Sequence, residues 1–237
     1  MTQLHLLIPN GEAIPYQLER RSRKTVGLKI NPNGLIVHAP TRLSQKELER
    51  MLLSKADWIV KKLEAQQENQ LEKFIWKNGA SLLLLGNAIE LSVRLDPVNR
   101  ALEYEPGRIS VALPTPNDQT SIARKVLQWY KKQALADFKR RIALLAAKLG
   151  VEIPPLLLSS ARSRWGSCNS RGEVRLNWRL LQAPPHIINY VVAHELAHLK
   201  EMNHSAKFWA TVERIYPDYK TAEKELKAWS TRLHQIA

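Results

Sequence analysis

Three of the chain's seven histidines lie within eleven residues, and this cluster is the clearest sign of chemistry in the sequence. Residues 194–198 read HELAH, and His204 follows. Residues four apart share one face of a helix, so His194 and His198 can reach the same metal ion, with Glu195 beside them to deprotonate a metal-bound water. His204 can fold back from beyond the helix end. Three protein ligands plus water is the arrangement of catalytic zinc sites, whereas structural sites have four protein ligands.

The helix that carries this motif is expected to be buried. Residues 187–199 are apolar nearly all round, which is typical of a core helix. Two histidines and a glutamate in such a helix would be costly unless they were paired or bound to metal. The sequence therefore predicts a hydrolase with one Zn²⁺ per chain, in which His194, His198 and His204 are ligands and Glu195 is the catalytic base.

Other interpretations of the same residues remain open. The histidines could be core side chains with satisfied hydrogen bonds, beside a glutamate that is there by chance. Glu201 or Glu213 could replace His204 as the third ligand. The ion could be manganese or another divalent metal, because ligand type alone does not select zinc.

Side chains outside the histidine cluster are expected to contact the substrate. Arginine binds phosphate through two parallel hydrogen bonds, and it can also stabilise the oxyanion formed in peptide hydrolysis. Strand alternation predicts that Arg162 and Arg164 share one face and that Arg175 and Arg179 share another. Cys168 is expected to be a small buried side chain near the site. The predicted substrate-binding residues are Arg162, Arg164, Trp165, Arg175 and Tyr190.

Composition limits the class of protein. The chain has 237 residues, 44% of them hydrophobic, a formal net charge of +14 and a single cysteine, which excludes an intrachain disulfide. No apolar run is long enough to cross a membrane, and no signal peptide is evident, so a cytoplasmic location is expected. The positive charge favours non-specific nucleic-acid binding through a basic surface, although a solvated helix face is the alternative.

The chain is expected to form two parts, residues 1–114 and 115–237. The first part reads as β-rich with one helix. Residues 14–31 and 34–39 are predicted strands joined by a turn at 31–34, and Ser44 with Glu47 forms a capping box for a helix that ends near Leu63. No internal repeat is evident.

The second part is expected to carry the catalytic elements. The segment Pro114-Thr115-Pro116 marks the boundary, and Thr115 is the predicted cap of a helix that runs to Leu149. Extended pieces at 156–165 and 173–178 follow, with an exposed strand edge beside the metal helix that could bind an extended peptide. The last three helices are predicted to start after Pro184, Ser205 and Pro217.

Several segments of the second part together resemble the motifs of a known family. They are residues 164–168, 176–178 with Leu180, 190–198, 203–205 and 208–209. Through these residues the chain is similar to the YgjP-like metal-dependent hydrolases, which are relatives of the SprT-like zincin metallopeptidases. The resemblance implies an α+β fold, with a zincin-like catalytic domain and a β-rich N-terminal region, and it implies zinc on His194, His198 and His204 with Glu195 as base.

The resemblance leaves the substrate open. The wider group includes proteases, some of which act on DNA-linked proteins, and one YgjP-type member is described as a pyrophosphatase of UTP. A metallopeptidase is the first hypothesis, a nucleoside triphosphate pyrophosphatase the second, and a DNA-associated protease or nucleic-acid-binding protein the third. Glu201 stands where metzincins have glycine, so we expect Asn203 in a left-handed conformation to turn the chain toward the metal.

Overall fold

A computed structural model describes residues 2–8, 11–31, 33–68, 74–96, 102–115 and 117–236. The contacts within the chain divide it into two compact units, Met1–Glu72 and Lys73–Ala237. The predicted boundary between residues 114 and 115 therefore falls inside the second unit. The physical reason is that Val111 and Leu113 share a hydrophobic core with Ile122 and Val126 of the helix that follows. The mixed helix and strand content confirms the α+β class.

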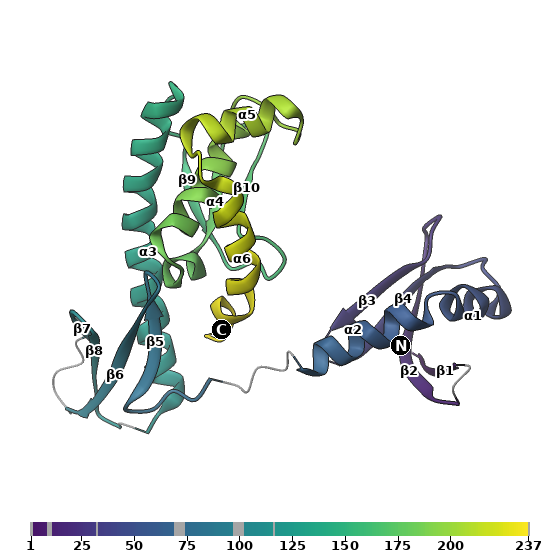
Figure 1. Ribbon diagram of the computed structural model, residues 1–237. Helices are drawn as coiled ribbons and strands as arrows, with labels where there is room; N and C mark the ends of the chain where they lie inside the picture. Colours follow the sequence, from purple (N-terminus) through teal and green to yellow (C-terminus); the bar gives the residue numbers. More distant parts are fainter. Residues whose placement is uncertain are drawn as a thin grey trace. The chain divides into compact units, whose positions relative to one another are not determined.

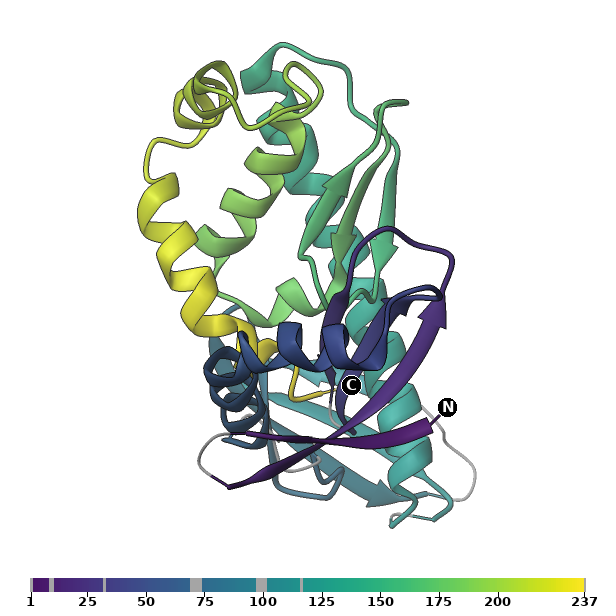
Figure 2. The ribbon, with the colours of Figure 1, turned by 90° about the vertical axis from the view of Figure 1, so that its right-hand side faces the viewer.

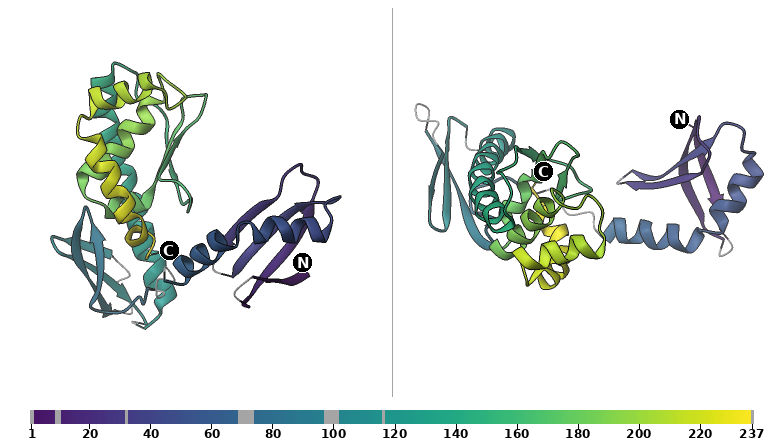
Figure 3. Two further views of the ribbon diagram at one scale, coloured as in Figure 1. Left: turned by 45° about the vertical axis from the view of Figure 1, so that its right-hand side comes forward. Right: turned by 90° about the horizontal axis from the view of Figure 1, so that it is seen from above.

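The first unit is one sheet with two helices packed against it (Figure 3). The strand order is β1-β2-β4-β3, in which β2 and β4 run parallel and the other neighbours are antiparallel. Burial alternates along β4, where Leu35, Val37 and Ala39 point into a core shared with Leu48 and Ile59 of the helices. The elements are β1 (Thr2–Leu7), β2 (Ala13–Arg21), β3 (Gly27–Asn31), β4 (Gly34–Pro40), α1 (Gln45–Leu53) and α2 (Ala56–Glu68).

Local predictions for this unit hold at some positions and fail at others. Asn31 pairs with Gly34 in the β3–β4 hairpin, which confirms the turn, although Pro32 lies outside the described residues. The capping box of Ser44 and Glu47 is present. The single helix predicted to Leu63 is two helices, because the chain turns after residue 53 and helix α2 starts at residue 56.

A second sheet with the same strand order opens the other unit. Its order is β5-β6-β8-β7, in which β6 and β8 run parallel, as β2 and β4 do in the first sheet. The structure thus repeats a topology that the sequence did not reveal. Leu85 and Gly86 both have positive φ, 51° and 86°, and form the tight β5–β6 turn. The strands are β5 (Ala80–Leu84), β6 (Asn87–Leu95), β7 (Leu102–Glu105) and β8 (Arg108–Leu113).

The long helix α3 (Gln119–Leu149) packs against several other elements of the second unit (Figure 1). It contacts β7 and β8 on one part of its length, and β9, α4 and α5 on another. Its cap is Asp118, whose side chain accepts a hydrogen bond from the Ser121 amide, so the prediction of Thr115 was wrong. The helix ends at Leu149 as predicted, because Gly150 follows in the left-handed conformation.

The remaining elements surround helix α4, which contacts α3, α5, α6 and β10 (Figure 2). The three-stranded sheet has the order β10-β11-β9, so β10 is an edge strand. Residues 160–165 are not a strand, and the predicted extended piece at 156–165 is therefore too long. The elements are β9 (Leu156–Ser159), β10 (Gly166–Cys168), β11 (Val174–Asn177), the 3₁₀ helix η1 (Trp178–Gln182), α4 (Pro185–Ala197), α5 (Ala206–Ile215) and α6 (Tyr219–Leu233).

Candidate metal centre

Helix α4 is held in place by its apolar surface and by one buried arginine. Nine of its residues are buried, which agrees with the prediction of a core helix. Pro185 occupies its first turn, where a missing amide proton is tolerated. Arg141 of α3 donates hydrogen bonds to the Pro185 carbonyl and to Asn189 Oδ1, and it forms an ion pair with Asp137. This network fixes the start of α4 against α3.

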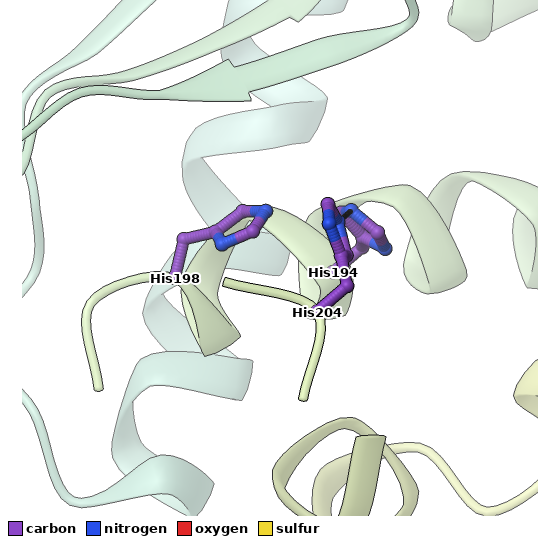
Figure 4. Close-up of side chains that lie close together, drawn as sticks. All are labelled: His194, His198 and His204. Atoms are coloured by element: carbon purple, nitrogen blue, oxygen red, sulfur yellow. Dashed lines mark hydrogen bonds between the residues drawn. The ribbon is translucent and has the colours of Figure 1, made fainter. Parts of the chain in front are cut away.

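The three predicted ligands gather at the other end of the helix (Figure 4). His194 lies in the last turn of α4, His198 is its C-cap, and His204 returns from the following turn. The ring centroids lie 4.9–5.1 Å apart. The potential ligand atoms all lie within 4.8 Å of one another, and they are the one such group of three found among the described residues. Neither Glu201 nor Glu213 belongs to this group.

The arrangement of the ring nitrogens fits a shared metal ion. His204 Nε2 lies 3.1 Å from His194 Nε2. Two nitrogens bound to a tetrahedral zinc ion at 2.0–2.1 Å would lie about 3.3 Å apart. His198 Nδ1 lies 3.1 Å from the Glu201 carbonyl, which can only accept a hydrogen bond, so Nδ1 carries the proton and Nε2 keeps its lone pair for a metal.

Electrostatics favour neutral rings, the form that binds metal. Burial, followed by the neighbouring His198 and His204, lowers the pKa of His194 to about 4. Burial also lowers the pKa of His198. His194 Nδ1 is buried and has no hydrogen-bond partner among the described residues, a cost that proteins tolerate mainly where function requires it.

The turn that brings His204 back differs from the predicted one. Asn203 does not have a positive φ, so no left-handed residue makes the turn. Instead, the amides of Leu199, Lys200 and Glu201 bond to carbonyls of the last helical turn. The Asn203 side chain accepts a hydrogen bond from the Ser205 amide, and Ser205 caps α5 as predicted.

Aromatic side chains form the wall behind the histidines. Phe208 is fully buried, and its ring centroid lies 4.6–4.9 Å from those of all three histidines. Trp209 lies 5.8–5.9 Å from His194 and His204 by the same measure. Tyr190, one turn before His194, meets that ring edge to face at 6.0 Å. These contacts restrict the rotation of the rings.

Glu195 lies on the side of α4 that faces strand β10. It is 5% exposed, and burial raises its pKa to about 8, while the charge of Arg164 opposes this rise. A Cβ atom at Gly166 would overlap the Glu195 carboxylate, so only glycine leaves room for it. Sequence reasoning missed this role of Gly166, although the residue lies within one of the motifs quoted above.

The five predicted substrate-binding residues do not form one group. Tyr190 contacts the ring of His194, and the charge of Arg164 opposes the rise in the pKa of Glu195, so these two residues lie at the site. Arg162 and Trp165 line a separate pocket, and Arg175 is an exposed residue of β11.

Two further expectations for this region differ from the structure. Arg162 and Arg164 lie in the loop before β10, and Arg179 lies in η1, so strand alternation does not govern these residues. Cys168 is half-buried, and its pKa is raised by burial and then by the charge of Glu195.

Comparison with known proteins matches the chain over residues 24–229 to the YgjP-like metallopeptidase domain. A UTP pyrophosphatase of Escherichia coli strain K12 is 32% identical over 73 residues, which are 31% of this chain and 44% of that protein. The match thus spans less than half of that relative. Among the described residues, no helix is long and apolar enough to cross a membrane.

Two solved structures of metallopeptidase zymogens also show similarity. Abylysin of Pyrococcus abyssi is 24% identical, with a TM-score of 0.36, over 38% of this chain and 92% of that one. Jannalysin of Methanocaldococcus jannaschii is 22% identical, with a TM-score of 0.34 and the same coverage. At TM-scores this low, neither likeness says what this chain binds or cleaves. The match over most of the sequence nevertheless decides the family: the chain belongs to the YgjP-like family of metallopeptidase domains.

Proposed function

We propose that this chain is a zinc-dependent hydrolase, with a polypeptide as its first candidate substrate. The observation that carries the proposal is the convergence of three histidine rings beside a buried glutamate. The Nε2 lone pairs of His194, His198 and His204 would hold the ion. When bound, zinc would lower the pKa of a coordinated water and polarise the bond to be cleaved.

Glu195 has the position and the environment for proton transfer. Its carboxylate is confined between α4 and the backbone of Gly166, so it has few alternative orientations. Burial favours its protonated form, while a nearby cation favours the ionised form. In the proposed reaction Glu195 takes a proton from the attacking water and returns it to the leaving group. Arg164, which already interacts with Glu195, supplies positive charge for a developing oxyanion.

The edge strand beside the site supports a peptide substrate. Strand β10 pairs with β11 on one side only and contacts α4 on which the histidines lie. An extended polypeptide can add to such an edge through main-chain hydrogen bonds. Because Gly166 belongs to this strand and touches Glu195, a peptide bound there would run past the proposed base.

Pyrophosphate hydrolysis of a nucleoside triphosphate is the second candidate. It is supported by the similarity to the Escherichia coli UTP pyrophosphatase and by the arginines before β10. The same proton transfers by Glu195 would serve attack on phosphorus. The DNA-associated protease or nucleic-acid-binding protein remains a prediction that rests on the net charge of +14 and on the family resemblance.

Mass spectrometry of reaction products separates these candidates. Zinc-loaded wild type, Glu195→Gln and the control Glu152→Gln would each be incubated with an unfolded protein and, separately, with nucleoside triphosphates. Glu152 is an exposed glutamate that follows α3 and does not belong to the histidine cluster, so its variant loses the same charge without removing a proposed ligand or the proposed base. We expect new peptides from wild type and from Glu152→Gln only. Nucleoside monophosphate with pyrophosphate in the same two samples would favour the second candidate, and no product of either kind would refute the hydrolase.

A further inference from the structure

A pocket of about 280 Å³ lies where the loop before β10 meets the end of α6. It is separate from the histidine cluster, none of whose members lines it. Trp165, in its wall, precedes Gly166, whose backbone touches Glu195, so the pocket adjoins the candidate active site. The lining residues are Arg162, Ser163, Trp165, Ser230, Thr231 and His234.

Arg162 lines this pocket, and Arg179, which is not one of the lining residues, interacts electrostatically with two that are. Arg179 is 6% exposed, and burial followed by the charge of Arg162 lowers its pKa; burial followed by the charges of Arg179 and Arg162 lowers the pKa of His234. The Nε atom of Arg179 donates to the Ile236 carbonyl at 3.2 Å, but its buried Nη1 has no hydrogen-bond partner among the residues that the structure describes. Within the described part of the chain, no ion pair is formed by Arg162 or Arg179. Leaving a buried charged donor unpaired is costly, which points to a missing anion.

The wall of the pocket is rigid. The Trp165 indole donates a hydrogen bond to Ser230 Oγ at 3.2 Å, and Ser230 Oγ donates in turn to the Leu226 carbonyl. The Trp165 ring also stacks on His234, with centroids 4.8 Å apart and planes 27° apart. Two exposed residues, Ser163 and Thr231, place hydroxyl groups at the rim. The Arg162 side chain and these hydroxyls therefore line a cavity whose wall is held by hydrogen bonds.

We propose that this pocket binds the phosphate group of a small phosphorylated ligand. A phosphate monoester carries a charge of about −1.5 to −2 at neutral pH, which is opposite to that of the Arg162 guanidinium in the lining and of the buried Arg179 guanidinium near it. Guanidinium groups bind such oxygens through paired hydrogen bonds, and the hydroxyls of Ser163 and Thr231 add further donors. The cavity is larger than one phosphate group, so it leaves room for the rest of the ligand. This proposal does not depend on the hydrolase, because binding requires neither the histidines nor Glu195.

Calorimetric titration of the full chain with inorganic phosphate tests the proposal. A chelator would be present so that phosphate cannot bind a metal at the histidines. We expect saturable binding that Arg162→Gln weakens about tenfold or more, as is typical when a hydrogen bond to a charged group is lost. The matched control is Arg232→Gln, which removes the same charge from the end of α6 beside the pocket, where Arg232 stacks on Trp229 and does not line the pocket. The control should change affinity by less than about twofold.

Two further arms keep the test decisive. Thr231→Val removes one rim hydroxyl without changing side-chain size and should weaken binding by roughly threefold to tenfold, even if the arginine variant misfolds. Uridine monophosphate that binds more tightly than phosphate would indicate a phosphate monoester, and equal affinity would indicate free phosphate as the ligand. The proposal would be overturned if phosphate binding did not saturate or if Arg162→Gln and Arg232→Gln lost equal affinity for phosphate. Acetate that binds as tightly as phosphate would also overturn it.

Discussion

Replacement of Gly166 by alanine should reduce hydrolysis sharply while leaving the metal site intact. The added Cβ would lie 2.6 Å from Glu195 Cγ and 2.7 Å from its Cδ, whereas ordinary contacts start near 3.4 Å. The Glu195 side chain must therefore move by at least about 0.8 Å, and Oε1, which lies closer still to the added Cβ, by more; a misplacement of about 1 Å in a reacting group costs roughly 10²-fold in rate. The backbone of Gly166 has no positive φ, so the effect comes from the contact and not from strain.

The assay is the rate of hydrolysis of the substrate that the product analysis identifies. Gly166→Ala should lower kcat about 100-fold and the free energy of unfolding by only about 1–2 kcal/mol, the usual cost of mild overpacking. Ser167→Ala, one residue further along β10, is the control. In a Glu195→Gln background, Gly166→Ala should have no further effect on rate, because both changes act on one group. Full activity in the single variant, or an equal loss in both backgrounds, would refute this role of Gly166.

Three other predictions concern the frame of the site. Arg141→Met should lower the free energy of unfolding in urea by about 3 kcal/mol, because it leaves the Asp137 carboxylate buried without its main partner. The control Arg140→Met, at an exposed position, should change this free energy by less than about 1 kcal/mol. Phe208→Leu should lower zinc affinity measured by chelator competition about tenfold, since it removes the ring that restricts all three histidines. Burial and two nearby arginines lower the pKa of His234, so the folded state disfavours its protonation, and stability should fall as pH drops below about 6.5. His234→Gln should reduce the loss of unfolding free energy between pH 8 and pH 5, and an unchanged loss would contradict this assignment.

The local features of the site were predictable from the sequence. The spacing of His194 and His198 follows from the helical period, and the apolar residues of the same helix indicate its burial without knowledge of the fold. Ser44, Ser205 and Gly150 likewise mark helix ends through hydrogen bonds or backbone angles within a few residues. Such signals depend on neighbours in the chain and can be read from it.

Features that depend on distant contacts were not predictable in this way. The unit boundary was misplaced because the packing of β8 on α3 joins segments on either side of Pro114. Strand alternation predicted that Arg179 shares a strand face with Arg175, yet it is buried in the 3₁₀ helix η1 and donates a hydrogen bond to the Ile236 carbonyl, which follows α6. The fit of Gly166 against Glu195 likewise arises only when β10 packs on α4.

Zinc content and affinity test the central claim most directly. Wild type, His194→Ala, His198→Ala, His204→Ala and the control His186→Ala would be dialysed against zinc buffers and measured by mass spectrometry of the metal. His186 lies at the start of α4 and bonds to Glu225, away from the cluster. We expect one zinc ion per chain in wild type and in the control, and a loss of affinity of more than about 100-fold in each of the other three. Wild-type affinity in His204→Ala, or no zinc in wild type, would contradict the account.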